Sequence, residues 1–178
     1  MIKIFGRQLF FKFYHLIYEF DLAVDVQKPA LDYEIITDNI ERIDMGYFSI
    51  RMLKKVLKNN QNKSDCIMFK AKDTADIVGF ALVCYKGARE IHYHIKKTDA
   101  FITALGVFKE CRGKGYSQEI LRGVVDICKS KNLKLLKLSV DSDNHPAINA
   151  YEKFGFQKCG EKKFIRVASI DFLCRKAL

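Results

Sequence analysis

The most informative segment of the chain is VFKECRGKGYS, residues 107–117. Apolar residues lead into it, two glycines stand two positions apart within it, and a helix-forming segment follows it. Glycines permit tight backbone geometry and the close approach of a ligand. The first turn of a helix leaves N–H groups without partners, and the helix dipole favours an anion there. The stretch therefore predicts a strand, a phosphate-binding turn and a helix.

The spacing of the glycines excludes two common phosphate sites. A nucleoside triphosphate loop needs a serine or threonine directly after the lysine, but Lys114 is followed by Gly115. A dinucleotide fingerprint needs a third glycine, and Gln118 stands at that position. The remaining pattern, R-G-x-G between a strand and a helix, also fits an ordinary surface turn when it is taken alone.

The elements around the turn predict an α/β domain. Apolar residues recur at helical spacing through residues 116–130, and residues 133–140 form a predicted buried strand. A second helix begins at Pro146 and ends at Gly155. Further strands are predicted at residues 33–36, 66–70, 77–85, 89–95, 100–108 and 164–174, and a basic helix at residues 47–57. This order indicates a mixed, mostly antiparallel twisted sheet that is flanked by helices.

In this setting, residues 107–117 resemble the coenzyme A-binding motif of the GCN5-related N-acetyltransferase (GNAT) superfamily, V-x-P-x-x-R-G-x-G followed by a small residue. The matching positions are Val107, Arg112, Gly113 and Gly115, and the departures are Lys109 for proline and Ser117 for glycine or alanine. A second family pattern, N-x-x-A-x-x-x-Y-x-K-x-G-F, is similar to residues 144–156, NHPAINAYEKFGF. Two motifs in order are far more specific than either one.

The resemblance implies an acetyltransferase (GNAT) fold over residues 31–178, preceded by an N-terminal extension of residues 1–30. It implies an acyl-CoA-dependent N-acetyltransferase, in which a primary amine attacks the thioester of acetyl-CoA directly. Cys111 is then no nucleophile, because no acyl-enzyme is needed. We expect a small-molecule acceptor, such as an amino sugar or an amino acid, rather than a protein. The alternatives are a basic nucleic-acid- or protein-binding module and a coenzyme A-binding pseudoenzyme.

The resemblance also implies roles for single residues. Tyr151 matches the family's general acid, which protonates the departing thiolate, although its apolar helix face also fits a core aromatic. Asn144 matches a residue that contacts the cofactor arm, and it also fits a helix cap. The turn would hold the pyrophosphate and the preceding strand would follow the pantetheine arm, which gives the cofactor-binding residues Leu105, Val107, Arg112, Gly113, Lys114, Gly115, Tyr116, Ser117 and Asn144.

The sequence leaves several candidates for the general base, the group that takes the proton of the attacking amine. Counting back in twos along the strand before the turn places one face at Val107, Leu105, Thr103, Phe101 and Asp99. Asp99 could act as a base if it lies in the cleft, and His94 is a candidate one segment earlier. Either residue also fits a plain surface position, and a substrate amine could instead lose its proton through a water.

The charge of the chain suits a polyanionic ligand. The 178 residues carry a formal net charge of +10, and residues 109–137 alone hold eight basic and three acidic residues. Such a field would steer coenzyme A towards the predicted turn. No stripe of interleaved basic and aromatic residues predicts RNA binding, so we expect no nucleic acid partner.

The cysteines and the N-terminal segment indicate in which cellular compartment the protein is expected. Six cysteines in mostly apolar surroundings lack disulfide or metal spacing, which predicts buried reduced thiols, a cytoplasmic protein and no metal site. No run reaches the ~18 apolar residues of a membrane span. Residues 9–18 are aromatic and apolar, and residues 1–18 hold three basic residues and no acidic residue. We expect this extension to pack on the domain as an extra helix or strand, because aromatic stripes usually belong to a core; the alternative is that it rests on a membrane surface. An oligomer is also open.

Overall fold

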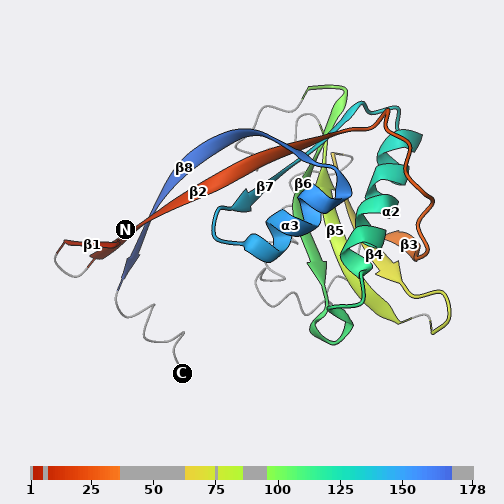
Figure 1. Ribbon diagram of the computed structural model, residues 1–178, viewed down its shortest axis with the longest axis horizontal. Coiled ribbons are helices and arrows are strands. Elements are labelled where there is room, and N and C mark those ends of the chain that lie inside the picture. Colours follow the sequence, from red (N-terminus) through yellow and green to blue (C-terminus); the bar gives the residue numbers. More distant parts are fainter. Residues whose placement is uncertain (1, 6–7, 37–62, 75, 86–95, 170–178) are drawn as a thin grey trace.

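The computed structural model describes residues 2–5, 8–36, 63–74, 76–85 and 96–169 (Figure 1). Two predicted elements, the basic helix at residues 47–57 and the strand at residues 89–95, lie outside this part of the chain. The end of the last predicted strand, after Ser169, lies outside it too. The elements that carry the two sequence motifs are all described.

The described strands form one eight-stranded sheet in the order β1-β2-β7-β6-β5-β4-β3, with β8 paired to β2. Among the described strand pairs, only β6–β7 is parallel, which confirms the mixed, mostly antiparallel sheet. The strands are β1 (Ile2–Phe5), β2 (Gln8–Asp21), β3 (Asp32–Ile36), β4 (Ser64–Lys70), β5 (Ile77–Cys84), β6 (Asp99–Val107), β7 (Leu135–Asp141) and β8 (Gln157–Ser169). The helices are η2 (Lys109–Cys111), α2 (Tyr116–Ser130) and α3 (His145–Phe154).

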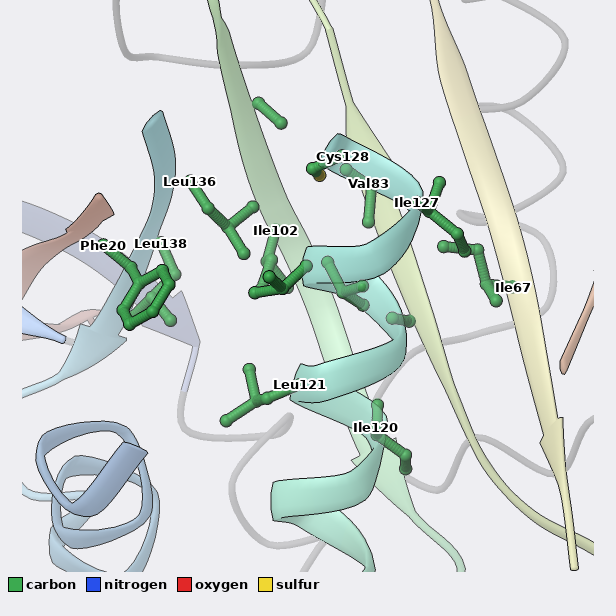
Figure 2. Close-up of a cluster of buried hydrophobic side chains, with 14 of the residues drawn as sticks. Phe20, Ile67, Val83, Ile102, Ile120, Leu121, Ile127, Cys128, Leu136 and Leu138 are labelled. Carbon is green, nitrogen blue, oxygen red and sulfur yellow. The ribbon is translucent and has the colours of Figure 1, made fainter. Parts of the chain in front are cut away.

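Helix α2 packs its apolar stripe onto the sheet and forms the centre of the core (Figure 2). The stripe predicted from the sequence is fully buried, with Ile120, Leu121, Val124, Val125 and Cys128 among its members. Gly123 allows the close approach, because a Cβ there would lie 2.4 Å from the ring of Phe69 on β4. Burial of such side chains contributes about 1.5–3 kcal/mol each, so α2 is held firmly in place.

The N-terminal extension supplies a strand in the interior of the sheet. Residues 15–21 of β2 pair with β7, and residues 8–19 pair with β8 on the other side. Tyr18 and Phe20 are buried in the core on the helix side of the sheet. Beyond β7, β2 and β8 continue as a ribbon that runs away from the body of the sheet (Figure 1).

The segment between β2 and β3 crosses the outer side of α2. The backbone N–H of Ala30 donates to Glu119 Oε2 at 2.7 Å, and Lys129 Nζ donates to the carbonyl of Val24 at 3.0 Å. Leu31 is buried where the segment rejoins the core. The extension therefore contacts both ends of α2. In the described part of the chain, no helix has the length and apolar character that crossing a membrane requires.

Candidate active site

The site lies where strands β6 and β7 separate. The two strands pair only between Asp99–Ile102 and Leu135–Leu138. Strand β6 continues to Val107 and β7 to Asp141, and the two diverge towards their carboxyl ends (Figure 1). The second half of β6 therefore keeps β5 as a partner on one edge and loses β7 on the other.

Among the described strands, none pairs with this edge of β6 beyond Ile102, and the edge presents backbone polar groups. The N–H of Phe108 donates to the carbonyl of Val78 on β5 at 2.9 Å, so Phe108 points its backbone groups at β5. Because these groups alternate along a strand, those of Leu105 and Val107 point away from β5, towards the separation from β7. The residues predicted to follow the pantetheine arm thus offer amide hydrogen-bonding groups at this edge.

A β-bulge in β6 corrects the face assignment made from the sequence. The pairing with β5 shifts by one residue at Thr103, so counting in twos across that residue gives the wrong face. Leu105 packs against the core on the same side as Ile102. By alternation from Ile102, Asp99 lies on the opposite side of the sheet from Leu105.

The turn after β6 has the backbone conformation that the glycine pattern predicts. Gly113 and Gly115 have φ angles of +79° and +80°, a region that strains other residues. Nothing lies within 4 Å of a Cβ added at either glycine, so the conformation and not a lack of space requires them. Gly115 is the N-cap of α2, and among the described residues no side chain caps this helix. The Gln118 N–H donates to the Gly115 carbonyl at 3.0 Å, so the first-turn amides available to an anion are those of Tyr116 and Ser117.

Two exposed cations flank the turn, which fits a polyanionic ligand. Arg112 and Lys114 are both exposed. Arg112 also donates from Nε to the carbonyl of Val107 at 3.2 Å, which links the turn to the end of β6. The backbone amides, the helix start and these charges together have the chemistry of a pyrophosphate site.

Helix α3 carries the second motif beside this turn. Asn144 caps the helix, since its Oδ1 accepts a hydrogen bond from the Ala147 N–H at 3.3 Å. Tyr151 is half-buried, and its ring packs against Phe156 with centroids 5.8 Å apart. Burial raises the pKa of Tyr151 to about 12, so the phenol keeps its proton near pH 7.

Of the two base candidates, Asp99 lies away from this turn. Asp99 begins β6, about 25 Å along the strand from Val107. Its buried carboxylate accepts hydrogen bonds from Lys137 Nζ at 2.9 Å and Thr98 Oγ1 at 3.0 Å. Burial alone would raise the pKa of this carboxyl, but the hydrogen bonds from Lys137 and Thr98 hold it below its usual range. His94 lies outside the described residues.

The sequence reasoning missed Gln118, which it used only to exclude a dinucleotide site. Gln118 lies in the first turn of α2, and its Nε2 donates to the carbonyl of Ala150 in α3 at 2.9 Å. It also missed the support that β2 gives to α3, where the Tyr18 hydroxyl donates to Glu152 Oε1 at 2.9 Å. No local signal could have revealed these contacts, because they join residues 32 and 134 positions apart.

Comparison with protein families and curated proteins gives consistent matches. The model of the acetyltransferase (GNAT) family matches residues 33–156. A Bacillus subtilis (strain 168) protein provisionally named a ribosomal protein bS18-alanine N-acetyltransferase is 40% identical over 65 residues, 36% of this chain and 43% of that protein. Streptothricin acetyltransferase of Streptomyces lavendulae is 33% identical over 85 residues, 48% of this chain and 41% of that protein. The matched part thus spans less than half of these relatives.

Solved structures show the same fold. A GCN5-related N-acetyltransferase from Sphaerobacter thermophilus has a TM-score of 0.61 and 15% identity, over 89% of this chain and 52% of that one. Ard1 from Thermoplasma volcanium has a TM-score of 0.57 and 16% identity, over 78% of this chain and 98% of that one. Both similarities concern the arrangement of the sheet and helices.

Proposed function

Because this chain belongs to the acetyltransferase (GNAT) family, we propose that it transfers an acetyl group from acetyl-CoA to a primary amine by direct attack. The observation that carries the proposal is the open backbone edge of β6, which leads directly into the uncapped start of α2. This arrangement offers hydrogen-bonding groups to an amide-containing arm and, next to them, a site for its pyrophosphate. Acetyl-CoA supplies the activated thioester carbonyl.

The proposed binding roles follow from the geometry. The Arg112 N–H donates to the Lys109 carbonyl at 3.3 Å, so the amides of residues 113–117 would hold the pyrophosphate, with the Arg112 and Lys114 side chains adding charge. The backbone groups of Leu105 and the N–H of Val107 would pair with the pantetheine arm, while the Val107 carbonyl accepts from Arg112 Nε. An N–H at this edge would also polarise the acetyl carbonyl, where a fixed donor stabilises the developing oxyanion.

Tyr151 would act as the proton donor to the departing thiolate. Its raised pKa favours this role in one respect, because the phenol is protonated at every pH at which the enzyme would work. Complete transfer to a thiolate of ordinary pKa, about 8.5, would be uphill, so the main contribution is a hydrogen bond to the developing charge. Asn144 would contact the cofactor arm through its side-chain nitrogen while its oxygen caps α3.

We assign Asp99 a structural role, since it forms a buried ion pair with Lys137 at the closed end of the β6–β7 pair. The acceptor amine would then lose its proton through a water or through His94. We further propose a small-molecule acceptor, an amino sugar or an amino acid, in a reducing cytoplasm. Cys66 and Cys128 support the compartment, because both are buried and burial raises the pKa of these thiols to about 11 and about 12.

The test is a panel of acceptors incubated with the full chain and acetyl-CoA. The panel contains amino sugars, amino acids, polyamines, streptothricin and peptides with N-terminal alanine, and the acetylated product is detected by mass spectrometry. We expect turnover with one amine class and none without acetyl-CoA. Acetyl-CoA binding without any turnover would favour the pseudoenzyme. A salt-sensitive gel shift with DNA or RNA, together with no acetyl-CoA binding in calorimetry, would favour the nucleic-acid-binding module.

A further inference from the structure

The side chain of Gln118 connects the phosphate-binding turn to the helix that carries Tyr151. Gln118 is the third residue of α2, in the turn whose amides are available to an anion. Its Nε2 donates to the carbonyl of Ala150, the residue before Tyr151, at 2.9 Å in a partly buried position. The amide nitrogen is thus directed at α3 and away from the position of a ligand on the turn.

Helix α3 is held less firmly than α2, so one hydrogen bond to it has a large effect. It has 10 residues and none of them is fully buried, whereas seven residues of α2 are. A helix this short depends on tertiary contacts for its stability. From the side of β2, Phe20 packs against Phe154, and Tyr18 donates to Glu152. From the side of α2, the Gln118 side chain contacts the segment next to Tyr151.

We propose that Gln118 is a positioning residue that couples occupation of the phosphate-binding turn to the placement of Tyr151. The inference rests on the proposed function, because it assigns the turn to coenzyme A and the proton donor to Tyr151. Binding of the pyrophosphate orders the first turn of α2, and the hydrogen bond to Ala150 carries that order to α3. Gln118 would then act on the rate of transfer and not on the affinity for the cofactor.

Gln118→Met tests this division, because methionine keeps the length and helix propensity of glutamine and removes the donor. We expect kcat to fall about tenfold, which corresponds to one hydrogen bond of ordinary net strength. The dissociation constant of acetyl-CoA should change by less than about twofold. Gln157→Met, the same change at an exposed position of β8, is the matched control and should leave both constants unchanged.

Two results would overturn the inference. A raised dissociation constant with unchanged kcat would make Gln118 a cofactor ligand. A lowered melting temperature with both constants unchanged would make it a purely structural contact. Gln118→Leu, which is similar in size, uncharged and without a donor, provides a second variant if the methionine variant does not fold.

A double-mutant cycle with Tyr151→Phe asks whether the effect passes through the phenol. If Gln118 positions Tyr151, then Gln118→Met should lower kcat by less than about twofold once the hydroxyl is gone. An undiminished tenfold loss in the Tyr151→Phe background would place the effect of Gln118 elsewhere.

Hydrogen exchange with coenzyme A as the probe separates this inference from the proposed function. In the unaltered protein, coenzyme A should protect the amides of residues 112–118 and those of α3. In Gln118→Met, protection of the turn should remain and that of α3 should be lost. Equal protection of α3 in both proteins would overturn the coupling, whereas no protection of the turn in either would overturn the coenzyme A site itself.

Discussion

The two helices beside the separation of β6 and β7 begin in opposite ways. Helix α2 begins at Gly115, which has no side chain and a φ of +80°. Helix α3 begins at Asn144, whose Oδ1 accepts the hydrogen bond of Ala147, and Pro146 in its first turn has no N–H at all. The first turn of α3 is therefore largely satisfied by its own residues, while that of α2 is left to solvent or to a ligand.

Because of this difference, the two helices have different roles in the proposed reaction. A helix start that leaves its amides open is suited to hold an anion, at a cost to its own stability. A helix start that is closed can contribute only through its side chains, and α3 places Tyr151 two turns further along. Changes to the backbone at the start of α2 should therefore alter binding. Changes in the side chains of α3, or in the Gln118 side chain that contacts α3, should alter rate, and changes at the cap of α3 should alter stability.

The largest effect is expected from Tyr151→Phe, which removes the proposed proton donor and keeps the ring against Phe156. We expect kcat to fall about 100-fold, the lower range for a general acid, with the affinity for acetyl-CoA unchanged. Steady-state rates and calorimetry measure the two quantities. The matched control is Tyr33→Phe, which removes a hydroxyl that donates to Asp126 on the outer side of α2 and should leave kcat unchanged. An unaltered kcat in Tyr151→Phe would remove the phenol from the mechanism.

The next effect is expected from Gly115→Asp, which gives the start of α2 a carboxylate of its own. Both Gly115→Asp and Gly115→Ala suffer the strain of a positive φ, about 1 kcal/mol or more, so alanine is the control for strain. The carboxylate should interact favourably with the positive end of the helix dipole and should repel a pyrophosphate. We expect the aspartate variant to bind acetyl-CoA at least about tenfold more weakly than the alanine variant, while its melting temperature is no lower. Equal affinities would show that no anion binds at this helix start.

The elements with local signals could be predicted from the sequence, and the contacts that join distant segments could not. Helix α2 has the bounds that its apolar stripe predicts, and α3 begins at its cap and ends before Gly155 as expected. The bulge at Thr103 depends on the register with β5, which no residue of β6 specifies alone. Counting in twos from Val107 back to Asp99 ignores this bulge. The sequence prediction therefore placed Asp99 on the same face as Leu105, whereas it lies on the opposite face.

The position of the N-terminal strand shows the same limit on a larger scale. The aromatic run at residues 9–18 indicated a helix or strand that packs on the domain or rests on a membrane. Its place between β7 and β8 is a property of tertiary pairing, since β2 must compete with every other strand for that edge. The local structure of the two motifs, in contrast, can be predicted from the sequence. The glycines and the asparagine cap determine the backbone conformation and hydrogen bonding of their immediate neighbours.

A smaller effect is expected from Asn144→Ala, which opens the start of α3. The loss of the cap should cost about 1 kcal/mol of the free energy of unfolding, or about 2–4 °C in the melting temperature. Thermal unfolding followed by circular dichroism measures it. Asn144→Asp retains an acceptor for the Ala147 N–H and should keep most of the stability. If Asn144→Ala instead left stability unchanged and weakened acetyl-CoA binding tenfold, the cap would be secondary to the contact with the cofactor arm.

The smallest effect concerns the alkaline part of the pH profile, where ionisation of Tyr151 should cause no loss of kcat. An ordinary tyrosine loses its proton near pH 10, whereas burial raises the pKa of Tyr151 to about 12. Raising the pH from about 8 to about 10 therefore leaves the phenol protonated, and kcat should not fall over this range on its account. Over the same range the acceptor amine becomes more fully deprotonated, so kcat/KM should rise or stay level. A fall of kcat with a midpoint near pH 10 that disappears in Tyr151→Phe would mean that cofactor binding exposes the phenol to water. In that case the packing of the Tyr151 ring against Phe156 would loosen in the bound state, although the cap at Asn144 would be unaffected.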